Sequence, residues 1–189
     1  MTCPSQRALR RGGVSLALVV LSACATETTA DKMALAPGAM QPLAHGARGE
    51  RAFRLGNVTG GGSTQAIGLS NISSEALRQA LETSLGNLNY LGDPATARYV
   101  VAVDILDLDR PVAALDPALL FVPVDLTVTA TLRYTVVPTG GGRPIFSDVV
   151  ATTGAGSGWT PAERVRKANE EAMRLNIAEF LKRLGPALP

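Results

Sequence analysis

The segment Val124–Val137, with the sequence VDLTVTATLRYTVV, alternates apolar and polar residues over almost its whole length. Its even-numbered residues are apolar, whereas its odd-numbered residues up to Thr135 are threonines, one aspartate and one arginine. Side chains of a strand point alternately to the two faces of its sheet. The pattern therefore predicts a strand of an antiparallel sheet that is packed on one face and hydrated on the other.

Three further strands are predicted around this one. The Gly- and Pro-rich stretch Pro138–Pro144 predicts a hairpin loop, after which Ile145–Thr153 returns as the partner strand. Tyr99–Leu108 is short and rich in β-branched residues, which is typical of a strand. A less regular strand is expected over Arg51–Val58, interrupted or ended by the glycine loop Thr59–Ser63. That loop lacks the Lys-Ser/Thr of a P-loop, so we interpret it as a turn or bulge.

Two helices are predicted between and after the strands. Ser73 is a suitable N-cap for a helix over Ser74–Leu88, in which leucines recur on one face. The sequence Thr160-Pro161-Ala162-Glu163 is a capping box that starts a second helix. This helix is expected to run to Leu184 and to stop at Gly185-Pro186.

The predicted element order is β-α-β-β-β-α. Because the last helix carries one broad apolar stripe, it has to pack on the apolar face of the sheet. We therefore expect an α+β fold, a two-layer sandwich in which both helices cover one face of an antiparallel sheet. This domain is expected to span residues 51–185.

The N-terminus has the features of a secretory leader, because Arg7, Arg10 and Arg11 precede an apolar run over residues 12–23. The run is too short for a membrane-spanning helix, which needs about 20 apolar residues. It ends in Leu21-Ser22-Ala23-Cys24, which resembles the lipobox of bacterial lipoprotein precursors. The resemblance implies cleavage before Cys24 and acylation of its sulfur.

With this cleavage, two parts precede the domain at residues 51–185. Residues 1–23 would be the lipoprotein signal peptide, and residues 24–50 the lipidated cysteine with a flexible tether rich in Ala, Thr, Gly and Pro. As a random coil, this tether would reach roughly 28 Å. The protein would then sit on a membrane through acylated Cys24 without crossing it.

The residue after the cysteine and the charge of the mature chain bear on location and partners. In enteric bacteria, an aspartate directly after the lipidated cysteine resembles a retention signal for the inner membrane. This chain has Ala25 at that position, which implies export to the periplasmic face of the outer membrane. Loss of the three leader arginines changes the formal net charge from +2 to about −1. No basic surface is left that would favour a nucleic acid partner.

The residues that could carry chemistry are few. His45 is the single histidine and lies in the predicted tether, so neither a catalytic triad nor a histidine metal site can be built. Asp104, Asp107 and Asp109 could form a carboxylate or cation site, but strand alternation places Asp104 on the opposite face from the other two. We expect a solvated strand end, no metal, no cofactor and no enzymatic activity.

Two pairs of polar residues have both a structural and a functional interpretation. Asp125 and Arg133 share the polar face of the threonine row, where they could meet a partner or only water. Asn169 and Asn176 fall seven residues apart within the apolar stripe of the last helix. Buried amides need hydrogen-bond partners, so we expect them to bond to the sheet or a loop, with ligand contact as the alternative.

The segment 113–123, AALDPALLFVP, is unusually apolar for a loop between strands. Exposed apolar patches mark contacts with proteins, lipids or membranes. Leu119, Leu120 and Phe121 are therefore the candidates for contact with a partner protein or a lipid.

The chain as a whole resembles small bacterial envelope lipoproteins of the YajG-like family and, more loosely, LptE-like lipoproteins. The resemblance is carried by SSEALRQALETSL (Ser73–Leu85), VDLTVTATLRYTV (Val124–Val136) and RVRKANEEAMRLNIAEFL (Arg164–Leu181). It implies a non-enzymatic, lipid-anchored adaptor or accessory subunit of an envelope assembly or transport system. The alternatives are a lipid or glycolipid carrier that uses the 113–123 loop, and a hydrolase or transferase that uses the aspartates.

Overall fold

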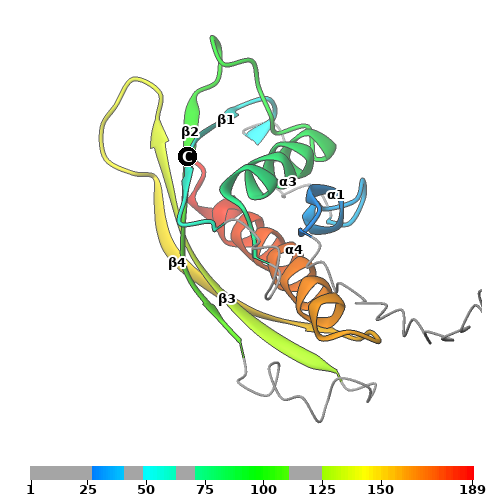
Figure 1. Cartoon of the computed structure of the whole chain (residues 1–189). Coiled ribbons are helices and arrows are strands. Elements are labelled where there is room, and N and C mark those ends of the chain that lie inside the picture. The colour runs from blue at the N-terminus through cyan, green and yellow to red at the C-terminus, as the bar shows by residue number, and fades with distance from the viewer. Residues whose placement is uncertain (1–26, 41–48, 63–70, 111–124) are drawn as a thin grey trace, which may run out of the picture.

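The computed structural model describes residues 27–40, 49–62, 71–110 and 125–189. Three helices lie on one side of a curved four-stranded sheet (Figure 1). The elements are α1 (Ala30–Met33), β1 (Phe53–Thr59), α3 (Ser74–Asn87), β2 (Tyr99–Asp109), β3 (Leu126–Pro138), β4 (Phe146–Gly156) and α4 (Pro161–Ala187).

The α+β class and the order of the main strands and helices are confirmed. The strands are arranged β1-β2-β3-β4, and the β2–β3 and β3–β4 pairs are antiparallel. β1 and β2, however, are parallel, so the sheet is mixed where a wholly antiparallel one was predicted. The reason is the connection through α3, because a chain that crosses a sheet face by a helix returns in its original direction.

The predicted hairpin is confirmed, with β3 and β4 paired from Val136↔Phe146 to Leu126↔Gly156. The even-numbered residues of β3 from Leu126 to Val136 are buried, and the intervening threonines and Arg133 are not. Burial therefore follows the alternation in the sequence. The alternation decides which face of the sheet receives the helices.

The last helix approaches β4 so closely that only glycine fits between them. A Cβ atom added to Gly154 would collide with backbone atoms of Ala168 and Ala172, and one added to Gly156 would meet the backbone of Arg164. Nearer the C-terminus of α4, the ring of Phe180 stacks on that of Tyr134 at a centroid distance of 4.1 Å. Small residues at one end and aromatic rings at the other thus set how α4 lies on the sheet.

Both predicted N-caps are confirmed. The Ser73 hydroxyl accepts from the backbone N–H of Ala76, and the Thr160 hydroxyl accepts from that of Glu163. The predicted stop after Leu184 is wrong, since α4 continues to Ala187 with Pro186 in its last turn. Buried Leu188, which follows the helix directly, holds this last turn against the core.

Part of the predicted flexible tether belongs to the folded domain. Residues 27–40, which we call the strap, contain α1 and pack on the helices, with Met33 and Leu35 fully buried. The Leu35 N–H donates to the Ser84 hydroxyl at 2.9 Å, and the Asn87 amide donates to the Leu35 carbonyl at 2.8 Å. Long-range contacts of this kind leave no periodic signal in the sequence.

The start of the strap is fastened to both larger helices. The backbone N–H of Thr29 donates to the Glu170 carboxylate at 3.0 Å, and the Thr29 hydroxyl donates to the same oxygen at 3.3 Å. Arg166, one turn earlier on α4, pairs with this oxygen at 3.1 Å. On the other side, the Thr28 hydroxyl donates to the carbonyl of Asn71, which lies just before α3. α1 therefore lies on α3 and α4, on their far side from the sheet (Figure 1).

The close contact between α4 and β4 predicts that Gly154→Ala lowers the free energy of unfolding by about 1–3 kcal/mol, as expected for an overpacked core. Gly140→Ala in the hairpin loop is the matched control, because a Cβ atom there meets nothing within 4 Å. Urea denaturation of both variants measures the difference. Equal stability of the two variants would contradict the described packing.

Candidate functional site

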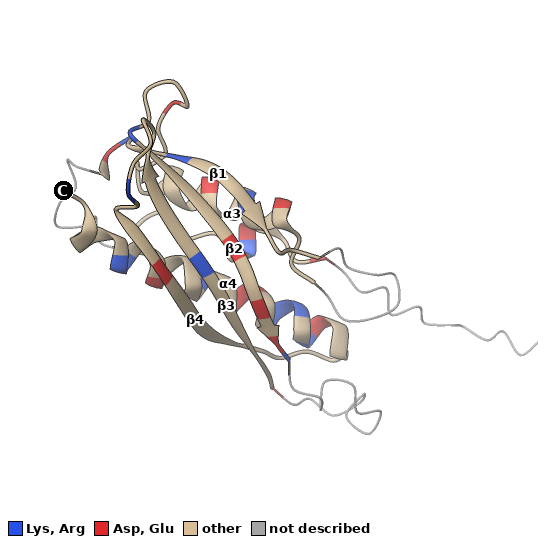
Figure 2. Ribbon diagram, turned by 90° about the vertical axis from the view of Figure 1, so that its left-hand side faces the viewer, with Lys and Arg blue, Asp and Glu red and all other residues tan. Residues whose placement is uncertain are grey.

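The face of the sheet opposite the helices is not covered by any described element (Figure 2). We call it the open face. It is formed by the outward-pointing residues of three strands. Those of β4 are exposed, whereas those of β2 and β3 are exposed or half-buried. Its residues are Val100, Ala102, Asp104, Asp107 and Asp109 on β2, Thr127, Thr129, Thr131, Arg133 and Thr135 on β3, and Ser147, Val149, Ala151, Thr153 and Ala155 on β4.

The open face is dominated by short, uncharged side chains. The hydroxyls of Thr129 and Thr153 form a hydrogen bond of 2.9 Å across the β3–β4 pair. Val149 is one of three large hydrophobic residues that the described structure leaves exposed, at 42%. β-Branched side chains have few rotamers, so a partner that covered them would immobilise little.

The three aspartates are placed differently from the prediction. A register shift between Ile105 and Asp107 places Asp104, Asp107 and Asp109 opposite Arg133, Thr131 and Thr129, so that all three belong to the open face. The inserted residue breaks the strict alternation on which the prediction relied. The Asp104 carboxylate also accepts a hydrogen bond from the Thr59 hydroxyl. In the part of the chain that the structure describes, no group of three His, Cys, Asp or Glu side chains could hold a metal ion.

Arg133 and Asp125 occupy two different positions along this surface. Arg133 is exposed near the middle of β3, opposite Asp104 on one side and Val149 on the other. Asp125 is exposed just before β3 begins. The sequence correctly assigned Arg133 to the threonine face. Its charge lies among the aspartates of β2 and the uncharged residues of β4.

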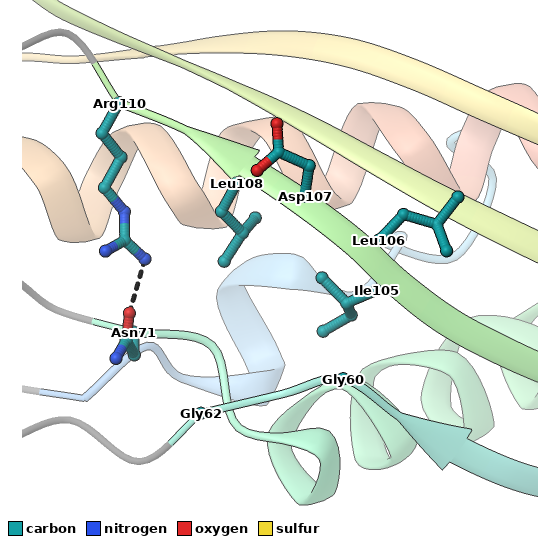
Figure 3. Close-up of a pocket in the computed structure, with 8 residues that line it drawn as sticks. All are labelled: Gly60, Gly62, Asn71, Ile105, Leu106, Asp107, Leu108 and Arg110. Atoms are coloured by element: carbon teal, nitrogen blue, oxygen red, sulfur yellow. Dashed lines mark hydrogen bonds between the residues drawn. The ribbon is translucent and has the colours of Figure 1, made fainter.

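A cleft of about 300 Å³ lies where β1 and β2 end (Figure 3). Ile105 and Leu108 supply its apolar wall, and Arg110 reaches across it to Asn71, whose Oδ1 accepts from the guanidinium at 2.6 Å. Burial lowers the pKa of Arg110 from its ordinary value. Asp107 also lines the cleft, but its carboxylate points to the other side of the strand from Leu108 (Figure 3).

The chemistry that this cleft offers is recognition of a small anion next to an apolar group. A guanidinium with one hydrogen bond to a neutral amide keeps further donors for a carboxylate or phosphate. The described residues that line the cleft include no serine, cysteine or histidine. The cleft is a candidate for binding a ligand of this kind.

A second hollow, of about 330 Å³, separates the strap from the start of α3. It is lined by residues 27–31 and by Ser73, Glu75, Ala76 and Gln79. Its charged residues are Glu27, Asp31 and Glu75, so it is acidic. This hollow marks the place where the described chain begins.

The buried asparagines of α4 have a structural role in at least one case. The Asn176 amide donates to the carbonyls of Ala130 and Val150 and to the Thr152 hydroxyl, at 3.0 to 3.2 Å. The expectation that it bonds to the sheet is confirmed. Asn169 is likewise fully buried on the same helix. Asn176 therefore fixes the position of α4 along β3 and β4 and does not face a ligand site.

The predicted site residues Cys24, Leu119, Leu120 and Phe121 lie outside the described residues, as does His45 of the predicted tether. The segment that carries the two leucines and Phe121 leaves β2 after Arg110 and rejoins the described chain at Asp125. Among the described helices, none combines the length and the apolar character that crossing a bilayer requires.

Two polar contacts of the site were not found by sequence reasoning. Asn71 follows the glycine loop without any pattern, and its contact with Arg110 joins residues 39 positions apart. The second contact joins Thr29 to Glu170. In the sequence, Glu170 belongs to an ordinary helical charge pattern, but its side chain is only 7% exposed. A glutamate on the border of an apolar stripe is a weak signal that such a contact exists.

No protein-family model and no curated protein sequence matches the chain. Several solved structures are similar to it, and three of them are compared below. One is a Xanthomonas campestris protein described under family DUF330, with a TM-score of 0.48 and 14% identity, over 64% of this chain and 65% of that one. The alignment thus spans less than two thirds of that protein.

Two further solved structures have lower TM-scores. A Caulobacter crescentus protein described as "a putative lipoprotein" has a TM-score of 0.38 and 11% identity, over 61% of this chain and 79% of that one. A hypothetical protein from Chlamydia trachomatis has a TM-score of 0.31 and 18% identity, over 49% and 55%. At these scores the similarities assign neither a family nor an activity.

Proposed function

We propose that this protein is a lipid-anchored lipoprotein of the bacterial cell envelope, and that it acts as a non-enzymatic adaptor or accessory subunit of an assembly or transport system. The anchor is acylated Cys24, and the expected location is the periplasmic face of the outer membrane. The lipobox and the basic, apolar leader support the anchor. The partner is a protein of the same envelope.

The open face is the observation that carries the adaptor role. One side of the sheet packs on α4, whereas the other side presents threonines, small apolar residues and exposed Val149. The helix side contrasts with it, because α4 carries ion pairs such as Lys167–Glu163 and Arg174–Glu171. Interface centres are poor in charged residues, so the part of the open face on β3 and β4, where Arg133 is the one charged member, suits a protein partner better than the helix layer does.

Site-specific photo-crosslinking in the native host tests this role. A photoreactive residue at Val149, on the open face, should give one discrete adduct, whereas the same residue at Lys182, 76% exposed on α4, should give none. Cys24→Ala should release the protein from the membrane fraction and remove the adduct. Identical adducts from both positions, or no adduct from Val149, would contradict the adaptor proposal.

The lipid or glycolipid carrier is the second candidate, and the cleft beside Arg110 favours it. An apolar wall of Ile105 and Leu108 next to a guanidinium suits a ligand with an acyl chain and an anionic group. Native mass spectrometry of the leaderless protein should then show a co-purified lipid that Arg110→Gln loses and Arg143→Gln, in the hairpin loop, retains. The carrier proposal would be contradicted if the protein never co-purified with a lipid, or if the Arg110→Gln variant retained the lipid.

A further inference from the structure

We infer that the domain is held directly against the bilayer by the side on which the strap begins, so that the open face is directed away from the membrane. The inference rests on the proposed acylation of Cys24. It concerns the surface of the protein that meets the lipid, which the anchor alone does not determine. A long tether would leave that surface unspecified.

The first step is the length of chain between the anchor and the folded domain. Only Ala25 and Thr26 separate Cys24 from Glu27, the first described residue. Three consecutive Cα–Cα steps span at most roughly 11 Å. The tether predicted from the sequence was much longer, because it included the residues that form the strap. With the strap folded onto the helices, the domain cannot move far from the acyl chains.

The second step is that the chain is fastened immediately after this short link. Thr28 is 4% exposed and its hydroxyl donates to the Asn71 carbonyl, while Thr29 donates twice to Glu170. Glu170 is itself buried and paired with Arg166. A carboxylate in this position is costly to leave without its donors. The exit point of the chain is therefore fixed relative to α3 and α4.

The third step is the direction of this exit point. α1 lies on the far side of α3 and α4 from the sheet (Figure 1), and the hollow beside it is lined by residues 27–31 and by Gln79 of α3. The open face looks the opposite way, with the sheet and the helix layer between it and the strap (Figure 1, Figure 2). A membrane that holds Cys24 thus faces the helix layer near Gln79.

Arg110 lies on the same side as the exit point. Its guanidinium donates to Asn71, whose backbone carbonyl receives the Thr28 hydroxyl, so two hydrogen bonds connect Arg110 to the start of the strap. A cation close to the bilayer surface is attracted to lipid phosphates. The acidic residues of the neighbouring hollow oppose this attraction, so the short link and not the charge sets the distance.

Quenching of single fluorescent labels tests the orientation. Cysteine is introduced at Gln79, beside the strap, or at Ala151, on the open face. Because both residues are exposed, the variants should remain folded. Thermal melting checks that they do. Cys3 is lost with the leader and acylation occupies Cys24, which leaves one free thiol. The full lipidated protein is placed in vesicles of phosphatidylcholine and phosphatidylethanolamine with a headgroup spin label. The Gln79 label should be quenched several-fold more than the Ala151 label.

A variant with a Gly/Ser insert of about 15 residues between Cys24 and Glu27 is the matched control, because it restores a random-coil reach of about 20 Å. The difference between the two labels should then largely disappear. Equal quenching at Gln79 and Ala151 in the protein without the insert, with intact mass showing acylated Cys24, would overturn the orientation and leave the anchor standing. An unmodified Cys24 would overturn the anchor and the orientation together.

Discussion

The contact between Thr29 and Glu170 is the interaction on which the arrangement of this protein depends. A glutamate buried on the side of α4 is stable only when donors satisfy it, and here the backbone N–H and hydroxyl of Thr29 join Arg166 in doing so. The contact connects residues 141 positions apart. Through it, the beginning of the domain is fixed to its last helix, and residues that follow Cys24 almost directly become part of the core.

The two faces of the sheet have opposite roles as a result of how α4 packs. Gly154 and Gly156 admit the helix backbone, Asn176 bonds to the strands, and the ring of Phe180 stacks on Tyr134. This face has no room for a ligand between α4 and β4. Recognition is left to the open face and to the cleft beside Arg110. The strap lies on the helix side, so the N-terminal end of the described chain is on the side opposite the open face (Figure 1).

The sequence predicted those parts of the fold that depend on local chemistry. The alternation of β3 identified the buried face, and the hydroxyls of Ser73 and Thr160 marked the starts of the two long helices. These signals work because side-chain periodicity and capping act over a few residues. For the same reason, Arg133 could be assigned to the open face before its surroundings were known.

The remaining features depend on contacts between distant parts of the chain. Parallel pairing of β1 with β2 follows from the path of the α3 crossover, and the register shift near Leu106 has no sequence signature of its own. The shift moved Asp104 to the same face as Asp107. Met33 and Leu35 lie in an Ala- and Pro-rich stretch without periodicity, which is why the strap was expected to be a tether.

Amide hydrogen exchange of the leaderless chain, resolved by residue with NMR, tests the central claim most directly. The claim is that the strap is folded onto the helices. The amides of Thr29 and Leu35, which donate to Glu170 and Ser84, should exchange orders of magnitude more slowly than in an unstructured peptide. Exchange at both amides as fast as in a random coil would show that the strap is a loose tether, and the fixed orientation would be lost with it.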